Sequence, residues 1–270
     1  MKLTVTCSKK TGKLNHFWRS TGFTPANLLF DPDMRQTLTY VGSIPHGGIT
    51  FVKIHFLLDL VKAKKLETEH PEYSWSDLDA GLDVLVQNGL KPFFELMGNP
   101  SDFFSDFCNN SQLHAWRRLV RDLALHLIER YGWEEVQSWY FVTWTEPDVS
   151  HHVGWWRQWP ENEEAFCNYY DACSEGLKEA DERLRLGGPE TCRTLSSMFK
   201  TFINHCDKGT NYFTGETGVR LDFICVHEKG ALSNDEDLNP NTRKISEREM
   251  EAIQYIRTNH PRFAKVPFIN

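Results

Sequence analysis

The segment Ser138–Asp148, with the sequence SWYFVTWTEPD, begins with residues typical of a strand and contains a carboxyl group, that of Glu146, near its end. Its first half is a run of aromatic and β-branched residues, a composition typical of a buried strand. Pro147 lacks a backbone N–H and therefore cannot continue such a strand inside a sheet. Glu146 is thus predicted to lie where a buried strand meets the loop that follows it.

A carboxyl group at this position has two interpretations. Partial burial beside Trp144 would raise the pKa of Glu146 towards neutrality, as a general acid for glycoside cleavage requires. Alternatively, the carboxylate of Glu146 caps the following loop and has no chemical role. The segment alone leaves both interpretations open.

The rest of the chain alternates between predicted strands and predicted helices. Strands are predicted at residues 17–23, 49–56, 92–97, around 140, and at 184–188, 221–227 and 266–270. Helices are predicted at residues 32–41, 75–87, 112–131, 163–180, 195–206 and 246–258. We expect Gly187-Gly188-Pro189 to stop the fifth strand, and Ser246 with Glu249 to form a capping box on the last helix.

This alternation predicts parallel β-α units. A doubly wound sheet would fit it, but no Gly-x-Gly-x-x-Gly motif follows the first strand to support nucleotide chemistry. Seven strands favour a (β/α)₈ barrel that is truncated after the start of the seventh strand, with residues 1–270 as one incomplete barrel domain. The chemistry of such barrels lies at the carboxyl ends of the strands, where His55, Glu146 and His227 are predicted to lie.

Composition narrows the possible partners. The 270 residues carry a formal net charge of −7 and no basic block, which disfavours a nucleic-acid partner but is compatible with a polyanionic substrate. No window approaches the roughly 20 apolar residues of a membrane span. Residues 1–10 lack a signal-peptide core, which taken literally favours the cytosol. The seven cysteines show no metal-type Cys-x-x-Cys spacing and are predicted to be buried free thiols.

Several longer segments carry a family resemblance. They are FWRSTGF at 17–23, FELMG at 94–98, NYYDACSEGL at 168–177, LGGP at 186–189, GTNYFTGE at 209–216 and GVRLD at 218–222. With these segments, the chain from about Phe17 to Asn270 resembles the α-L-iduronidases, lysosomal retaining glycoside hydrolases with (β/α)₈ barrels. The resemblance implies removal of terminal α-L-iduronic acid from dermatan and heparan sulfate, a lysosomal location, and no metal or organic cofactor.

The resemblance also implies roles for individual residues. Glu146 matches the acid/base, His55 matches a histidine that lines the sugar site, and His227 and Lys229 match a pair that contacts the uronic acid. A lysine beside a sugar carboxylate would form a charge-assisted hydrogen bond. Taken singly, His55 is compatible with a hydrogen-bonded core histidine and Lys229 with a solvated loop lysine.

Three departures from the family pattern keep other functions open. Thr145 stands where the family has Asn, and Lys53 stands where the family has Arg. The nucleophilic Glu of the family is expected about two residues beyond the position of Asn270. The alternatives are a catalytically inactive sugar-binding paralogue and a hydrolase of a neutral sugar such as xylose, although the charge of Lys229 argues against the neutral sugar.

A group of tryptophans follows Glu146 in the sequence: Trp155, Trp156 and Trp159. They are predicted either to stack against a sugar or cover the site as a lid, or simply to cover the barrel rim.

Overall fold

A parallel sheet of seven strands organises the computed structural model, which describes residues 4–9, 12, 16–149, 162–230 and 242–270. Each strand pairs with the next one along the chain, as a βα barrel requires. The strands are β1 (Ser20–Phe23), β2 (Phe51–Ile54), β5 (Lys91–Glu95), β6 (Tyr140–Val142), β7 (Leu186–Thr191), β8 (Phe223–Val226) and β9 (Phe268–Ile269). The prediction of a (β/α)₈ barrel truncated after the start of its seventh strand is therefore confirmed.

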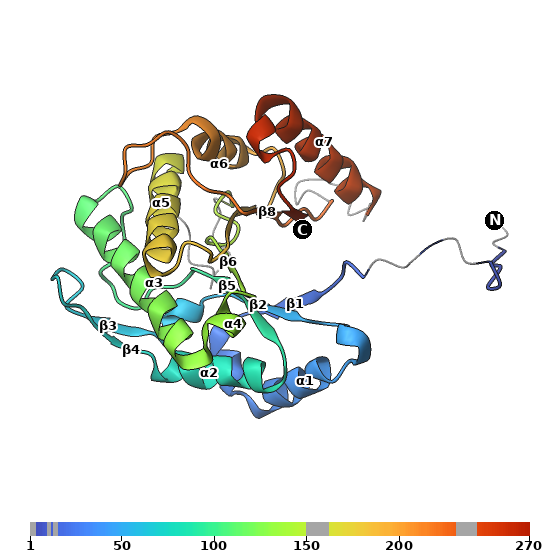
Figure 1. Cartoon of the computed structure of the whole chain (residues 1–270), viewed down its shortest axis with the longest axis horizontal. Coiled ribbons are helices and arrows are strands. Elements are labelled where there is room, and N and C mark those ends of the chain that lie inside the picture. The colour runs from blue at the N-terminus through green and yellow to red at the C-terminus, as the bar shows by residue number, and fades with distance from the viewer. Residues whose placement is uncertain (1–3, 10–11, 13–15, 150–161, 231–241) are drawn as a thin grey trace.

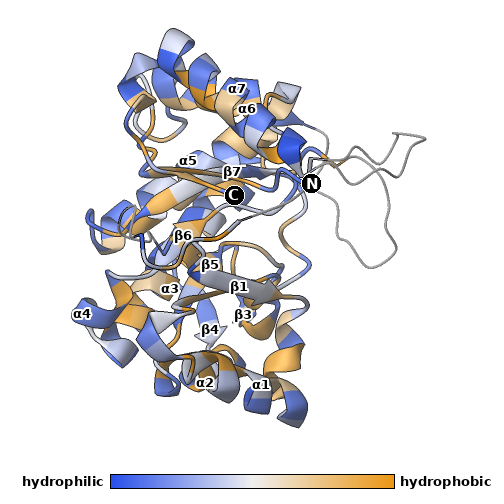
Figure 2. Ribbon diagram, turned by 90° about the vertical axis from the view of Figure 1, so that its right-hand side faces the viewer, coloured by the Kyte–Doolittle hydropathy of each residue, from blue (hydrophilic) through white to orange (hydrophobic). Residues whose placement is uncertain are grey.

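Six longer helices surround the sheet (Figure 1). They are α1 (Pro32–Gly42), α2 (Ser76–Gln87), α3 (Asn110–Tyr131), α5 (Glu163–Ala180), α6 (Ser197–Lys208) and α7 (Arg243–Asn259). Their apolar residues lie mainly on the side that faces the strands (Figure 2). The sheet thus curls inside a layer of helices, and the carboxyl ends of its strands share one end of this half-barrel.

Shorter elements that the sequence analysis did not predict complete the fold. An antiparallel pair, β3 (Lys62–Lys64) and β4 (Glu72–Ser74), lies between β2 and α2 in the chain. The single-turn segments are α4 (Trp133–Val136), η1 (Ala26–Phe30), η2 (Pro45–Gly47), η3 (Leu57–Leu60) and η4 (Pro261–Phe263). They are too short to produce a recognisable hydrophobic period.

The close packing of α3 against α5 forms much of the core. Trp116 is fully buried, and its indole N–H donates to Cys173 Sγ at 3.2 Å. Gly176 lets the two backbones approach, because a Cβ there would lie 2.6 Å from the carbonyl oxygen of Arg117. Leu123, two turns after Trp116, is fully buried on the same face of α3.

The structure corrects the predicted end of β7. The strand does not stop at Gly187-Gly188-Pro189 but continues to Thr191, and all of its residues are buried. Proline is tolerated there because the register to β8 shifts between Pro189 and Thr191, and such an irregularity relieves the need for a ladder hydrogen bond. The prediction failed because local composition does not show a bulge.

The predicted capping box of the last helix is also wrong. Helix α7 begins at Arg243 with Thr242 at the N-cap position, so Ser246 lies inside the first turns. Glu249 does not reach back to Ser246, because its Oε1 accepts a hydrogen bond from Asn270 Nδ2 at 2.7 Å. A tertiary contact therefore takes the side chain that the local motif needs.

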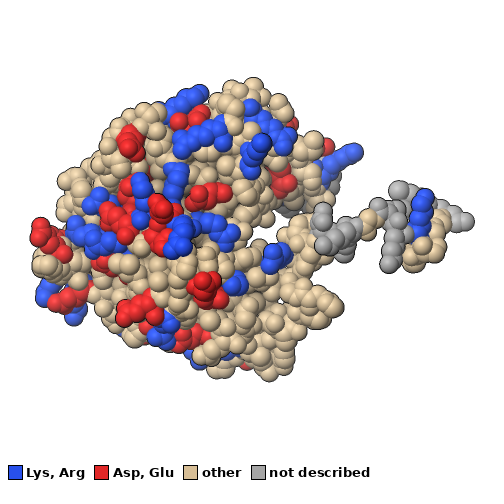
Figure 3. Space-filling model, in the orientation of Figure 1, with Lys and Arg blue, Asp and Glu red and all other residues tan. Residues whose placement is uncertain are grey.

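The surface carries mixed charge. On the face shown in Figure 3, basic and acidic side chains alternate over α3 and α5, and pairs such as Arg117 with Glu179 at 3.4 Å join the two helices. None of the helices in the described parts of the chain is long and apolar enough to cross a membrane. The seven cysteines are free thiols as predicted, but Cys7 and Cys108 are exposed rather than buried and Cys192 is intermediate.

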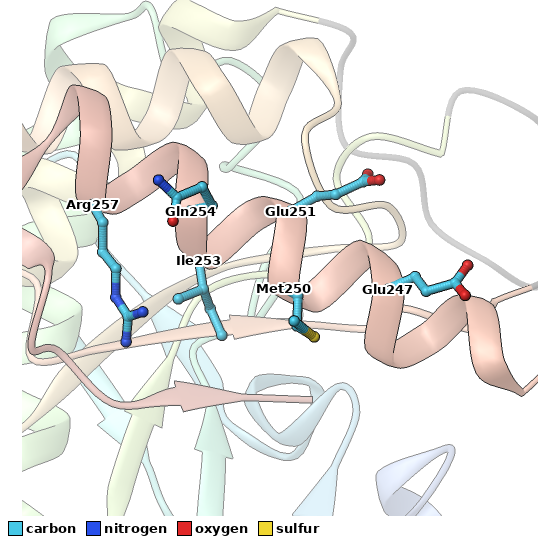
Figure 4. A pocket seen from close by; sticks show the side chains of 6 residues that line it. All are labelled: Glu247, Met250, Glu251, Ile253, Gln254 and Arg257. Atoms are coloured by element: carbon cyan, nitrogen blue, oxygen red, sulfur yellow. The ribbon is translucent and has the colours of Figure 1, made fainter.

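A groove lies along α7. Its lining side chains are Glu247, Met250, Glu251, Ile253, Gln254 and Arg257. Met250, Ile253 and Arg257 point to one side of the helix, and Met250 is 69% exposed (Figure 4). None of the predicted site residues lines this groove.

Candidate active site

The carboxyl ends of three strands bring the predicted residues together. Lys53 and His55 lie at the end of β2, and Glu146 follows β6. His227 and Lys229 come directly after β8. Because neighbouring parallel strands end at the same edge, side chains distant in sequence meet here, as the sequence analysis expected for His55, Glu146 and His227.

Glu146 is held in a left-handed backbone conformation, with a φ of +47°. Its backbone N–H donates to the carbonyl oxygen of Glu190 at 2.8 Å, which ties the loop after β6 to the end of β7. Its side chain is 17% exposed, and its Oε1 accepts from His227 Nδ1 at 3.1 Å and from Lys229 Nζ in an ion pair. The carboxylate therefore has two donors that both come from the loop after β8.

These donors reverse the pKa shift that was predicted for Glu146. Burial alone would raise the pKa of this carboxyl group, as the sequence analysis expected. The hydrogen bonds and charges of His227 and Lys229 outweigh burial and lower the pKa to about 2. The prediction of a raised pKa is thus wrong. Local sequence could not show the shift, because the two basic residues that cause it lie some 80 residues away in the sequence.

Two wholly buried carboxylates lie beneath the partly exposed basic groups. Glu95 accepts from His55 Nδ1 at 2.6 Å, and its other oxygen lies 3.6 Å from Lys53 Nζ. Glu190 pairs with Lys53 and lies 3.0 Å from His227 Nε2. Each basic head thus has an anionic partner on its buried side.

The opposite charges of Lys53 and Glu190 stabilise each other. Burial opposes the charge on Lys53, but Glu190, Cys225 and Glu95 outweigh it and raise the lysine pKa. Burial likewise opposes the charge on Glu190, but Lys53 and His227 outweigh it and lower the pKa of that carboxyl group. Lys53 and Glu190 are therefore charged at neutral pH.

Glu190 is a residue that the sequence analysis missed. Gly187-Gly188-Pro189 was predicted to end a strand, and Glu190 follows it directly. Its place next to a strand end could therefore have been recognised from the sequence. Because the strand was predicted to stop before Glu190, this residue had no predicted place at the edge of the sheet.

Thr145 is wholly buried, and its Oγ1 lies 3.4 Å from His227 Nδ1. Its hydroxyl thus approaches the histidine that also contacts Glu146. The role predicted for Thr145 in sugar binding stays a prediction. Trp155, Trp156 and Trp159, predicted to be a stacking surface, a lid or a rim cover, lie outside the described residues.

Further hydrogen bonds hold the loop after β8 in place. Glu228 is 5% exposed and accepts from Thr194 Oγ1 at 3.0 Å, from the backbone N–H of Gly230 at 2.9 Å and from Arg248 at 3.0 Å. The backbone N–H of Glu228 donates to Asn270 Oδ1 at 2.8 Å. The orientation of neighbouring Lys229 therefore depends on contacts to the ends of β7 and β9 and to α7.

The arrangement is suited to acid–base chemistry on an anionic or polar ligand. It presents one partly exposed carboxylate among the basic heads of Lys53, His55, His227 and Lys229. Among the described residues, no group of three or more His, Cys, Asp or Glu side chains has a geometry that could hold a metal ion.

Comparisons with known proteins show the family to which the chain is similar. A family model described as glycosyl hydrolases family 39 matches residues 1–270. The α-L-iduronidase of Mus musculus is 43% identical over 265 residues, which cover 94% of this chain and 40% of the relative. A solved structure of a bacterial orthologue of human α-L-iduronidase has a TM-score of 0.86 at 44% identity, covering 95% of this chain and 41% of that chain.

A more distant relative is named for a different sugar, xylose. The β-xylosidase of Caldicellulosiruptor saccharolyticus is 27% identical over 241 residues, which cover 84% of this chain and 46% of the relative. The chain thus spans less than half the length of each of these relatives.

Proposed function

The chain belongs to glycosyl hydrolase family 39, and on that basis we propose that it forms the acid/base part of an α-L-iduronidase-like glycosidase. The observation that carries this proposal is the contact of Glu146, at the end of β6, with the two basic residues His227 and Lys229. In this proposal Glu146 protonates the glycosidic oxygen and later deprotonates the water that releases the sugar with retention.

Retaining hydrolysis needs a second carboxylate about 5–5.5 Å from the first, which attacks the anomeric carbon. Glu95 and Glu190 are wholly buried and paired with basic side chains, so neither can reach a sugar ring. The activity is therefore proposed for a protein that spans the length of the relatives, with the nucleophile supplied by the strand that β9 begins.

Lys229 supports an anionic sugar as the substrate. Its side chain is 59% exposed while it pairs with Glu146, so a second anion can reach the ammonium group. A uronic acid carboxylate that binds Lys229 would compete with Glu146 for this cation. Glu146 would then lose one of the charges that lower its pKa and could take up the proton that a general acid must carry.

This competition would distinguish an anionic sugar from a neutral one. A neutral sugar such as xylose carries no carboxylate and would leave the Lys229–Glu146 ion pair in place. The proposed substrate is therefore terminal α-L-iduronic acid on dermatan and heparan sulfate, in lysosomal glycosaminoglycan degradation, with Lys53, His55, Thr145 and His227 lining the sugar site. No metal or organic cofactor enters this mechanism.

The test is turnover of a fluorogenic α-L-iduronide and a fluorogenic β-xyloside by a protein of the relatives' length that contains this chain. We expect turnover of the iduronide and a loss of about 10²–10⁴-fold in Glu146→Gln. The matched control is Glu216→Gln, which changes an exposed glutamate on the loop before β8. Ordinary iduronide turnover in Glu146→Gln would overturn the acid/base assignment.

The two alternative functions have distinct outcomes in the same assay. Faster turnover of the xyloside than of the iduronide would indicate a neutral-sugar hydrolase. Binding of dermatan sulfate fragments by the folded wild-type protein, without turnover of either glycoside, would indicate an inactive sugar-binding paralogue.

A further inference from the structure

The carboxylate of Glu190 joins three strand ends at one oxygen. Glu190 Oε2 accepts from Lys53 Nζ, which comes from β2, and lies 3.0 Å from His227 Nε2, which follows β8. Lys53 Nζ and His227 Nε2 are themselves 2.8 Å apart. The three polar atoms form a closed triangle, and the Glu190 side chain is wholly buried.

The other nitrogen of the same ring faces the candidate acid/base. His227 Nδ1 lies 3.1 Å from Glu146 Oε1 and 3.4 Å from Thr145 Oγ1. The imidazole of His227 is therefore a bridge between two carboxylates, with Glu190 buried on one side and the partly exposed Glu146 on the other.

We propose that Glu190 is a positioning residue for Glu146, acting by fixing the His227 ring so that Nδ1–H always points at the Glu146 carboxylate. The inference rests on the proposed function only in taking Glu146 as the acid/base. Glu190 itself touches no substrate, because it is wholly buried.

Hydrogen-bond chemistry explains how Glu190 can hold the charged ring directly and the neutral ring through Lys53. The ammonium of Lys53 can only donate, so in the neutral ring Nε2 accepts from Lys53 and the proton lies on Nδ1. When the ring is charged, Nε2–H donates to Glu190 instead. In both states Nδ1–H donates to Glu146, and the ring gains or loses its proton only at Nε2.

The charges around the ring agree with this competition. Burial and the charge of Lys53 lower the pKa of His227, while Glu190 and the hydrogen bond to Glu146 raise it, and the net shift is upward. Glu190 and Lys53 thus act on the ring in opposite directions. The remaining ionisable or polar groups near the ring, directly or through these partners, are His55, Glu95, Thr145, Cys225 and Lys229.

The backbone at Glu190 shows that its position is over-determined. Its φ is +58°, a conformation that a non-glycine residue adopts at a cost of about 1 kcal/mol or more. Its carbonyl oxygen accepts from the backbone N–H of Glu146 at 2.8 Å, and the next residue, Thr191, accepts from the N–H of His227 at 2.8 Å. The backbone at Glu190 and Thr191 is thus hydrogen-bonded to Glu146 after β6 and to His227 after β8.

The experiment is a pH titration of the histidine side chains by ¹⁵N NMR in the 270-residue chain. The variants are Glu190→Gly, which suits the positive φ, Glu190→Gln, which keeps the shape and removes the charge, and Lys53→Met. Three histidines with their own aspartate partners report on folding in the same spectra: His126 with Asp79, His205 with Asp171 and His260 with Asp207.

In the wild type we expect the proton of neutral His227 on Nδ1. We expect Glu190→Gly and Glu190→Gln to move the titration midpoint of His227 to lower pH, because the charged ring loses the carboxylate that accepts from Nε2–H, while Lys53 still keeps the proton of the neutral ring on Nδ1. We expect Lys53→Met to move the midpoint to higher pH. Midpoints that stay at the wild-type value, or that move in the same direction in the Glu190 and Lys53 variants, would overturn the inference.

The titration uses no substrate, so its failure is distinct from failure of the proposed function. Iduronide hydrolysis by a protein of the relatives' length, together with a His227 midpoint that does not change in the Glu190 variants, would refute this inference alone. Opposite shifts in the two variants, with no glycoside turnover, would support the positioning role of Glu190 and refute the proposed function.

Discussion

The backbone N–H of Glu146 donates to the carbonyl oxygen of Glu190 across 2.8 Å, and both residues have positive φ, +47° and +58°. Two carboxylate-bearing residues are thus fixed next to each other at the ends of neighbouring strands β6 and β7. The Glu190 side chain is buried and holds Lys53 and His227. The Glu146 side chain is partly exposed and accepts from His227 and Lys229. Backbone strain concentrated at such positions is typical of functional sites.

Lys229→Met should raise the pKa of the Glu146 carboxyl group. The substitution removes the cation that pairs with Glu146 Oε1 but leaves the hydrogen bond from His227 Nδ1, so the pKa should rise yet not reach the value set by burial alone. Carbon-13 NMR of the glutamate carboxyl groups as a function of pH measures this change.

The matched control for that experiment is Lys265→Met, which removes an exposed lysine just before β9. The titration of Glu146 should not respond to this control. An unchanged titration of Glu146 in Lys229→Met would show that the ion pair does not set the charge state of the carboxylate.

Acid should destabilise the chain partly through Glu146. The pKa of this group is about 2 in the folded protein and about 4.3 in an unfolded chain, so the folded state binds the proton more weakly. A carboxylate with a lowered folded-state pKa stabilises the protein above about pH 4.3, and that contribution, at most about 3 kcal/mol, is lost as the pH falls towards 2. Between these pH values, the free energy of unfolding should therefore decline less steeply in Glu146→Gln than in wild type.

Urea unfolding at pH 7, 4 and 3 measures this difference. Glu216→Gln serves as the control, because this glutamate is exposed and should leave the pH dependence unchanged. Parallel pH profiles for wild type and Glu146→Gln would contradict the depressed pKa.

Local sequence patterns were sufficient to predict the order of the elements. Leu78, Leu82 and Leu85 repeat at helical spacing in α2 and are fully buried, although β6 ends at Val142, before Pro147 is reached. Such patterns also locate a residue at a strand end, which is how Glu146 was found before the structure was known.

Contacts between strands were not predictable in the same way. Whether burial or nearby cations decide the pKa of Glu146 depends on His227 and Lys229, which the fold brings from two strands further along the sheet. The role of Glu190 depends on Lys53 and His227 meeting at its oxygen. The residue types indicate what each group can do, but only the register of the parallel strands determines which groups meet.

Arg248 and Glu228 should show a clear coupling energy in a double-mutant cycle. The pair joins α7 to the loop that carries Lys229, and the Glu228 side chain is only 2% exposed. We expect Arg248→Met and Glu228→Gln to be coupled by about 1–3 kcal/mol in the free energy of unfolding. Thermal or urea unfolding of the two single variants and the double variant measures this energy.

The comparison pair lies in the same helix. Arg243 and Glu247 form an ion pair whose side chains are 85% and 59% exposed, so their coupling should be only about 0.3–0.5 kcal/mol. Equal coupling energies for the two pairs would show that the loop after β8 is not held by Arg248.

Gly187→Ala should destabilise the protein, because strand β7 has no room for a side chain at this position. A Cβ there would lie 2.3–2.5 Å from three ring carbons of Phe223 on the neighbouring strand. Phe223 is 1% exposed and cannot move outward, so the cost should be about 1–3 kcal/mol or more. Gly89→Ala is the control: its Cβ meets nothing within 4 Å, and only its positive φ of 69° costs about 1 kcal/mol. A Gly187→Ala variant that unfolds at the wild-type urea concentration would disprove the tight packing of β7 on β8.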